Sequence, residues 1–309
     1  MKFAFFFPGQ GSQSIGMMQG LADMPVVRDT FTEASDILKA DFWHMATEPN
    51  EQLNLTSNTQ PLMLAAGIAT WRAWQAQGGE APALMAGHSL GEYSALVAAG
   101  VLDFKDALPL VRYRAEVMQG AVAEGEGAMA AVLGLDDDMV RAVCAEAAQG
   151  QVLEAVNLNS PGQVVIAGHK AAVERGMEAA KARGAKRALP LPVSVPSHCA
   201  LMRPAAEELR AYLADVALHA GNVPVLHNAD VAAYAEPEKI KDALVRQLYS
   251  PVRWVETVQT VRAQDVEASA ECGPGKVLAG LTKRIVADLP CIALTGLEAI
   301  EEARQQFNQ

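Results

Sequence analysis

The feature that most constrains the fold of this chain is the pentapeptide Gly-His-Ser-Leu-Gly at residues 87–91. The apolar run 83–86 precedes it, and the run 92–99 after it has the composition of a helix. A strand, a tight turn and a helix in direct succession are typical of a nucleophile elbow. Glycines are expected on both sides of Ser89, because a Cβ there would crowd the backbone of so tight a turn. The pentapeptide therefore predicts an α/β fold with Ser89 at the apex of a turn.

The helix that follows makes this turn a candidate site for covalent acyl transfer. The first turn of a helix has backbone N–H groups without partners and carries the positive end of the helix dipole. Both face the place where an oxyanion would form next to Ser89. A plain structural turn is the alternative, since the same pentapeptide also arises by chance in loops. A catalytic serine further requires a base, an oxyanion hole and a group that holds the substrate.

His198 is the strongest candidate for the base among the six histidines. It follows a loop that Pro196 makes rigid, and it lies downstream of Ser89, as in the α/β-hydrolase order of serine, acid and histidine. His88 lies inside the elbow, and we expect it to point away from Ser89 and to pack or form hydrogen bonds. The remaining histidines have no catalytic context and are His44, His169, His219 and His227.

The acid of a catalytic triad is not evident. The acidic run 136–138 stands at the start of a predicted helix, where it is more simply explained as a cap that complements the helix dipole. A backbone carbonyl or an amide is the alternative partner that would orient the histidine, which leaves a Ser-His dyad.

The order of the predicted elements divides the chain into a large and a small part. Strands and helices alternate around the elbow, with a strand at 2–7 and helices at 59–77 and 103–118, which indicates a mostly parallel, covered sheet. After about residue 121 the order becomes βαββαβ, the ferredoxin-like unit. Its predicted strands and helices, in chain order, are 128–133, 136–148, 152–158, 163–167, 171–183 and 188–193. We predict an α/β-hydrolase-like large domain at 1–122 and 195–309, with an inserted ferredoxin-like subdomain at 123–194.

Composition excludes several classes of protein. The net charge of −11 argues against a general nucleic-acid binder, which would need a basic surface. No apolar run is long enough to span a bilayer, and the run Phe3–Phe7 lacks the length and cleavage site of a signal peptide. We therefore expect a cytoplasmic protein with neither a membrane nor a nucleic acid as partner. The four cysteines are scattered, so neither a metal site nor a disulfide framework is predicted.

The glycines after the first strand do not indicate a dinucleotide site. Gly9 and Gly11 fit the fingerprint of such sites, but Ser14 stands where the third glycine should be. A loop that holds a backbone N–H near the nucleophile fits this segment better.

Several motifs together resemble the malonyl-CoA:acyl-carrier-protein transacylases of bacterial type II fatty-acid synthesis. The resemblance extends from Phe3 to about Arg284, nearly the whole chain. The matching segments are residues 7–13, residues 87–92, Arg114 with Met118 and Gln119, residues 196–198, residues 247–254 and residues 273–278.

The resemblance implies a role for each matching position. Ser89 would attack the malonyl thioester and become a malonyl ester, and His198 would take the serine proton and later activate the incoming thiol. The backbone N–H groups of Gln10 and Leu90 would form the oxyanion hole. Arg114 would pair with the free malonyl carboxylate, a geometry that suits a guanidinium. Without the resemblance, a solvated helix arginine is the simpler interpretation.

The remaining implications concern His198 and the partners. Gln247 would hold the histidine through its backbone carbonyl, which explains the missing acid. The partners would be malonyl-CoA and an acyl carrier protein, and the enzyme would be a monomer. No cofactor would be bound, because coenzyme A arrives as a thioester substrate and phosphopantetheine is carried by the partner. Candidate docking residues for the acidic carrier are Lys181, Arg183, Lys186 and Arg187, with Lys283 and Arg284 near the other edge.

Two other functions share parts of this pattern. A serine esterase or thioesterase has the elbow and the histidine, but it also needs an acid and a His-Gly-Gly-Gly oxyanion loop, which this chain lacks. A catalytically silent module that only binds carrier proteins would have no need of Ser89 and His198. The sequence leaves open how strictly malonyl is preferred over other acyl groups and whether the product serves fatty-acid or polyketide synthesis.

Overall fold

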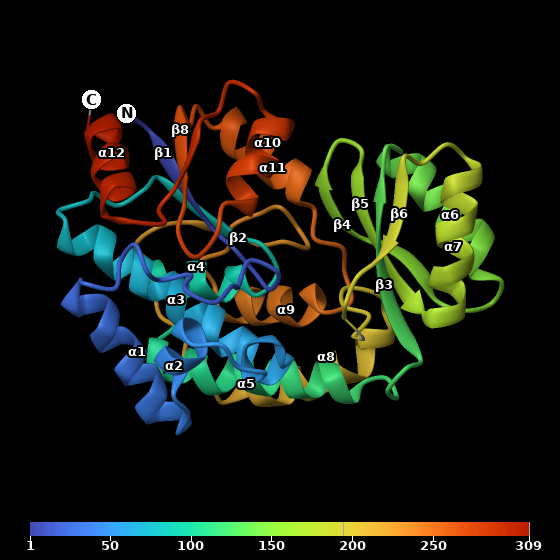
Figure 1. The fold of residues 1–309 in the computed structure, drawn as a ribbon, viewed down its shortest axis with the longest axis horizontal. Coiled ribbons are helices and arrows are strands. Elements are labelled where there is room, and N and C mark those ends of the chain that lie inside the picture. Colours follow the sequence, from blue (N-terminus) through green and yellow to red (C-terminus); the bar gives the residue numbers. More distant parts are fainter. Residues whose placement is uncertain (194, 309) are drawn as a thin grey trace.

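A parallel sheet lies at the centre of the larger part of the molecule, as the computed structural model shows for residues 1–193 and 195–308 (Figure 1). Within these residues five strands pair in the order β7-β2-β1-β8-β9, and each pair of neighbours is parallel. In that order the strands are Val225–Leu226, Leu84–Gly87, Phe3–Phe7, Ala268–Glu271 and Cys291–Ala293. The central strand β1 is buried along its whole length, which explains why its sequence is an unbroken apolar run.

Helices cover both faces of this sheet, and β1 shows how the two faces divide. Phe5 contacts Trp71 and Trp74 of α3 on one face, whereas Phe6 packs against Trp254 of α10 on the other. This is the alternation expected of successive side chains in a strand. In the view of Figure 1, helices α3 and α5 lie below the strands, and α10 and α11 lie to the right of β1 and β8.

The helices of the larger part begin and end as follows: α1 Pro25–Leu38, α2 Phe42–Thr47, α3 Thr56–Ala76, α4 Gly91–Ala98, α5 Phe104–Gly120, α8 Arg203–Ala214, α9 Pro237–Gln247, α10 Trp254–Ala263, α11 Val277–Ile285 and α12 Leu297–Phe307, with 3-10 turns at Gln52–Asn54 and Ala200–Met202. Among the described helices, none combines the length and the apolar character needed to cross a membrane.

The smaller part has its own antiparallel sheet, with strands in the order β4-β5-β3-β6. Its elements are β3 Gly127–Leu133, α6 Asp137–Ala148, β4 Leu153–Ser160, β5 Gln163–His169, α7 Lys170–Ala182 and β6 Arg187–Pro190. Helices α6 and α7 pack on one face of this sheet around a separate apolar core. This is the predicted βαββαβ order, so the mixed α/β fold class with a mostly parallel sheet and a ferredoxin-like unit is confirmed.

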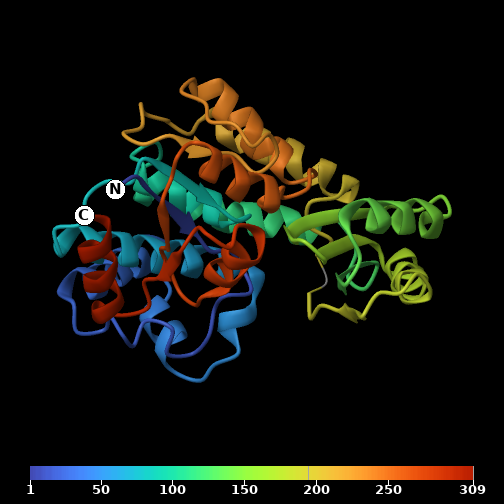
Figure 2. The ribbon, with the colours of Figure 1, turned by 90° about the horizontal axis from the view of Figure 1, so that it is seen from above.

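The two parts are joined by hydrogen bonds as well as by the chain. Val252, just before α10, donates its N–H to the carbonyl of Val156 at 2.8 Å and accepts from Leu158 N–H at 3.0 Å. Figures 1 and 2 both show the smaller part extending to one side of the larger one. The domain boundaries at 122 and 195 stay a prediction, and residues 194 and 309, at two of the predicted ends, lie outside the described residues.

Candidate active site

Ser89 lies in a strained turn between β2 and α4. Its φ angle is +51°, in the left-handed region that side chains other than glycine rarely adopt. A Cβ on Gly87 would overlap the backbone of Gly91, and a Cβ on Gly91 would overlap the carbonyl of Phe7. Both glycines are therefore required, as the pentapeptide predicted. The turn leaves Ser89 partly exposed while its neighbours on both elements are buried.

His198 lies beside this serine although 109 residues separate them. Its Nε2 is 2.8 Å from Ser89 Oγ, and its Nδ1 is 2.8 Å from the backbone carbonyl of Gln247. Since a carbonyl oxygen only accepts, Nδ1 carries the proton and Nε2 presents a lone pair to the serine hydroxyl. The backbone carbonyl thus fixes the tautomer that a general base requires, a task that a carboxylate performs in a triad.

The surroundings of His198 keep its imidazole neutral. The side chain is buried, and burial together with the positive charge of Arg114 lowers the pKa of His198 to about 3, partly opposed by its hydrogen bond to Gln247. A neutral imidazole at physiological pH is free to accept the proton of Ser89.

Arg114 projects from α5 into the same site and is itself buried. It donates from Nη1 to Oε1 of Gln60 and from Nη2 to Oε1 of Gln247, both at 2.8 Å, and Nη2 lies 3.4 Å from Ser89 Oγ. Its Nε has no partner among the described residues, and none of their carboxylates forms an ion pair with it. A buried guanidinium held only by neutral acceptors, next to a nucleophile, is suited to an anionic group.

The loop after β1 lies against the elbow, with Gly9, the residue before Gln10, next to Leu90. His88 donates its N–H to the carbonyl of Phe7 at 2.9 Å, and a Cβ on Gly9 would lie 3.6 Å from the nitrogen of Leu90. In the described residues the backbone N–H groups of Gln10 and Leu90 form no hydrogen bond. A free N–H group on the elbow and another on the loop packed against it are the donors that an oxyanion hole requires.

Behind the elbow lies a buried polar cluster of which only Gln247 was a predicted site residue. Glu92, in the first turn of α4, accepts hydrogen bonds from His227, Asn228 and Gln247. His227 and Asn228 come directly after β7, the neighbour of β2 in the sheet. The carboxyl ends of neighbouring parallel strands meet at one edge of a sheet, so polar residues directly after an apolar strand were the available signal. The sequence reasoning also missed Gln60 of α3.

The other residues considered from the sequence lie outside this constellation. The Nε2 of His88 lies 2.8 Å from Oδ1 of Asn159, as expected of a hydrogen-bonding residue. Asp136 caps α6 by accepting from Met139 N–H at 2.8 Å, which confirms the structural interpretation of the acidic run.

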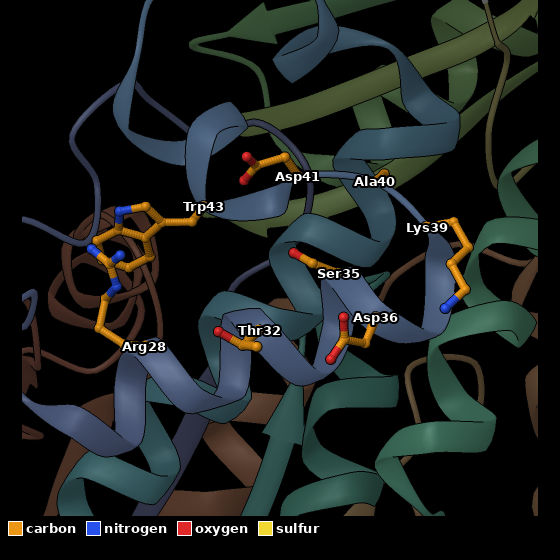
Figure 3. A pocket seen from close by; sticks show the side chains of 8 residues that line it. All are labelled: Arg28, Thr32, Ser35, Asp36, Lys39, Ala40, Asp41 and Trp43. Atoms are coloured by element: carbon orange, nitrogen blue, oxygen red, sulfur yellow. The ribbon is translucent and has the colours of Figure 1, made fainter.

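A hollow of about 570 Å³ between α1 and α2 contains none of the predicted site residues (Figure 3). In Figure 3 the guanidinium of Arg28 lies against the ring of Trp43, 4.1 Å from its centroid. Ser35 in the same wall accepts from the N–H of Phe42. This hydrogen bond holds the start of α2 against α1.

Comparisons with known proteins agree with this geometry. The family model of the acyl transferase domain matches residues 4–297. A curated relative from Escherichia coli strain K12, named malonyl CoA-acyl carrier protein transacylase, is 58% identical over 304 residues and 98% of each chain. The crystal structure of an acyl-carrier-protein S-malonyltransferase from Burkholderia pseudomallei 1710b has a TM-score of 0.97 and 58% identity, covering 99% of this chain and 100% of that one.

A second solved structure is a type II PKS acyl-carrier protein in complex with its malonyl-transacylase. It has a TM-score of 0.97 and 55% identity, and the match covers 99% of this chain and 100% of that one. A nucleophile elbow, a neutral histidine and a buried arginine thus occur in a chain that matches the family model over nearly its whole length. This chain belongs to the acyl transferase domain family.

Proposed function

We propose that this chain transfers the malonyl group of malonyl-CoA to the phosphopantetheine thiol of an acyl carrier protein, through a malonyl ester on Ser89. The names of the relatives support this reaction. The observation that carries it is the position of Arg114, a buried guanidinium with its Nη2 3.4 Å from Ser89 Oγ and only neutral side chains as partners. A malonyl group differs from other short acyl groups by the carboxylate that such a guanidinium would bind.

In the first half-reaction Ser89 is acylated. His198 Nε2 takes the proton of Oγ as the oxygen attacks the thioester carbonyl, and the N–H groups of Gln10 and Leu90 bind the resulting oxyanion. As the tetrahedral intermediate collapses, the carbon–sulfur bond breaks and His198 returns the proton to the sulfur of coenzyme A. The free carboxylate of the malonyl group stays on Arg114 throughout.

In the second half-reaction the carrier takes the acyl group. The phosphopantetheine thiol gives its proton to His198 and attacks the ester carbonyl through the same oxyanion hole. The carbon–oxygen bond to Ser89 breaks, and Oγ recovers the proton from His198. The product is malonyl on the carrier protein, which supplies fatty-acid chain elongation.

We also propose the cofactor use, oligomeric state, location and domain organisation of the protein. Coenzyme A enters as a thioester substrate, phosphopantetheine belongs to the carrier protein, and the reaction uses no bound cofactor or metal. The protein works as a monomer in the cytoplasm. Residues 123–194 act as a subdomain inserted into the large domain formed by the flanking segments.

Intact-mass analysis after mixing with malonyl-CoA tests this function directly. We expect a mass gain of one malonyl group that maps to Ser89, and its loss when an acyl carrier protein bearing phosphopantetheine is added, with malonyl recovered on the carrier. Steady-state kinetics should show the parallel double-reciprocal lines of a ping-pong reaction. Release of the adduct to water at the same rate with and without carrier would instead identify an esterase.

A further inference from the structure

Three hydrogen-bond donors converge on the side chain of Glu92. His227 Nδ1 donates to Oε1 at 2.6 Å, while Asn228 N–H and Gln247 Nε2 donate to Oε2 at 2.8 and 3.0 Å. The side chain is completely buried. Burying a carboxylate costs free energy unless hydrogen-bond donors surround it. Because three donors surround the carboxylate of Glu92, the site is organised around this group.

One of these donors, Asn228, also forms hydrogen bonds with the elbow. The side chain of Asn228 accepts from Ser89 N–H at 2.8 Å through Oδ1 and donates to the carbonyl of Gly87 at 2.6 Å through Nδ2. It thereby holds the strained backbone on both sides of His88. Glu92 in turn fixes the backbone of Asn228.

The second donor, Gln247, also forms hydrogen bonds with Ser89, Arg114 and His198. The side-chain Nε2 of Gln247 also donates to the carbonyl of Ser89 at 3.0 Å, and its Oε1 accepts from Arg114 at 2.8 Å. The backbone carbonyl of the same residue holds His198. If this amide were flipped, its NH₂ would face the N–H groups of Arg114, and its oxygen would face Glu92. A carboxylate at position 92 accepts and cannot donate, so Glu92 acts together with Arg114 and the carbonyl of Ser89 against the flipped orientation.

We propose that Glu92 is a positioning residue for acyl transfer, which orients the Gln247 amide against Arg114 and holds Asn228 against the elbow. Glu92 itself contacts neither Ser89 Oγ nor His198. The inference rests on the proposed function, because it takes Arg114 as the group that holds the malonyl carboxylate. It adds a buried residue that sets acyl selectivity without contacting the acyl group.

Two substitutions separate this role from a general effect on folding. Glu92→Gln can keep an oxygen towards Asn228 and Gln247 while its NH₂ faces His227, whose Nδ1 becomes an acceptor when the proton moves to Nε2. Because this Nε2 is buried without a partner among the described residues, E92Q should lose some stability. We expect E92Q to keep the ratio of malonyl to acetyl transfer. Glu92→Met has a similar shape but no acceptor, and we expect roughly a 100-fold loss of kcat/KM for malonyl and about a 10-fold loss for acetyl.

Glu271 provides a matched control, since it is also a buried glutamate that accepts a backbone N–H, from Ala279 at 2.8 Å. Glu271→Met should lower both acyl transfers in proportion to any loss of folded protein and leave their ratio unchanged. Should E92M fail to fold, Glu92→Asp serves instead, because it withdraws the carboxylate from Gln247 by one methylene. In this variant the ratio of malonyl to acetyl transfer should fall while the protein stays folded.

Labelling of Ser89 by a fluorophosphonate probe completes the experiment, because it needs the elbow and His198 but no malonyl group. We expect labelling to be slowed in E92M and to be near the wild-type rate in E92Q. The inference would be overturned if a folded E92M or E92D variant kept the wild-type ratio of malonyl to acetyl transfer. It would also be overturned if E92Q lost this ratio as fully as E92M does. A wild-type protein that is labelled but takes no malonyl would instead contradict the proposed function, and labelling would still test Glu92.

Discussion

Ser89 and His198 both have left-handed backbone conformations, with φ angles of +51° and +66°. Such strain persists only where the surrounding structure imposes it, and it is concentrated at functional sites. The backbone N–H of His198 is held by the carbonyl of Leu248 at 2.9 Å, next to Gln247, whose own carbonyl holds the ring. One short segment at the end of α9 thus fixes both the backbone and the side chain of the base.

The first prediction concerns these two residues as a unit. Ser89→Ala and His198→Ala should each remove most transfer activity, and the double variant should lose little more than either single one. The physical reason is that the proton transfer from Oγ to Nε2 requires both partners. Measured kcat/KM values for the three variants test this, and losses that multiply in the double variant would show that the residues act independently.

Arg114→Ala should change which acyl group is transferred. The substitution removes the charge-assisted pair that offsets desolvation of the malonyl carboxylate, so malonyl transfer should fall by roughly 100-fold or more. Transfer of acetyl should be retained or increased. The measurement is kcat/KM for malonyl-CoA and acetyl-CoA side by side, with Arg112→Ala on the same helix as the control. Equal losses for both substrates would refute the carboxylate-binding role.

The pH dependence of acylation should reflect the buried histidine. Because burial and the Arg114 charge lower the pKa of His198 to about 3, the base is already deprotonated throughout the range from pH 5 to 8. Single-turnover acylation by acetyl-CoA should therefore show no half-loss near 6.5, the ordinary pKa of histidine. In Arg114→Ala the acidic limb should move upwards, because the positive charge that opposes protonation is gone. A wild-type midpoint near 6.5 would contradict this description of the site.

At the scale of elements, the junction between β8 and α11 contains a buried acid with consequences for stability. Glu271 caps α11 by accepting from Ala279 N–H, but its Oε1 has no partner in the described residues. Burial raises the pKa of Glu271 from 4.5 to about 7, although the N–H groups of α11 oppose this. The folded protein therefore binds this proton more tightly than the unfolded chain.

Stability from this proton is fully present below about pH 4.5 and is lost as the pH rises through about 7. The loss is up to about 3 kcal/mol in the free energy of unfolding. Glu271→Gln keeps the acceptor for Ala279 and cannot ionise, so it should gain stability relative to wild type between pH 5 and 8. Urea denaturation at several pH values measures this, with the exposed Glu298→Gln as control. A constant difference between E271Q and wild type across that range would contradict the prediction.

Elements with a strong local pattern could be predicted from sequence, and their ends less well. The apolar run of β1 and the glycines of the elbow determine local structure by themselves. Helix α3 begins at Thr56, three residues before the predicted start, and continues through Pro61, which lies inside the helix. Strand β6 ends at Pro190 instead of residue 193, since Pro190 and Pro192 cannot donate to a ladder.

Site residues could be predicted where the neighbouring sequence reveals their role. They could not be predicted where the role depends on contacts that only the folded chain makes. Ser89 is recognisable from its neighbours in the chain. Arg114 has no local mark that separates it from a solvated helix arginine, and the resemblance to a family singled it out. The bond from Glu92 to His227 joins residues 135 apart and depends on β7 lying next to β2. The polar residues after β7 mark a strand end, but the order of strands in the sheet is not encoded near either residue.

For the whole molecule, the charge distribution bears on carrier docking. The net charge of −11 opposes an acidic carrier, so a local basic surface is needed. Of the residues proposed from sequence, Lys181 and Arg183 are paired with Glu178 and Glu146, whereas Lys186 and Arg187 form no ion pair within the described residues. The surface around β6 therefore keeps its positive charge.

Reversing Lys186 and Arg187 to Glu should raise the KM for the carrier protein several-fold and leave acylation by malonyl-CoA nearly unchanged. Reversing Lys181 and Arg183 is the matched control and should do less, because their charges are already neutralised. The wild-type KM for the carrier should also rise with salt. If reversing Lys186 and Arg187 left the KM for the carrier protein unchanged, the docking surface would lie elsewhere.

The orientation of His198 by a carbonyl instead of a carboxylate has a consequence for the choice of acceptor. A carboxylate would stabilise the imidazolium that forms when the base takes a proton, whereas here the neighbouring Arg114 disfavours it. A thiol, with a pKa near 8.5, gives its proton to any such base far more easily than water, with a pKa near 15.7. We therefore expect the acyl-serine to react with the thiol of a carrier faster than with water, so that the intermediate can persist until a carrier arrives.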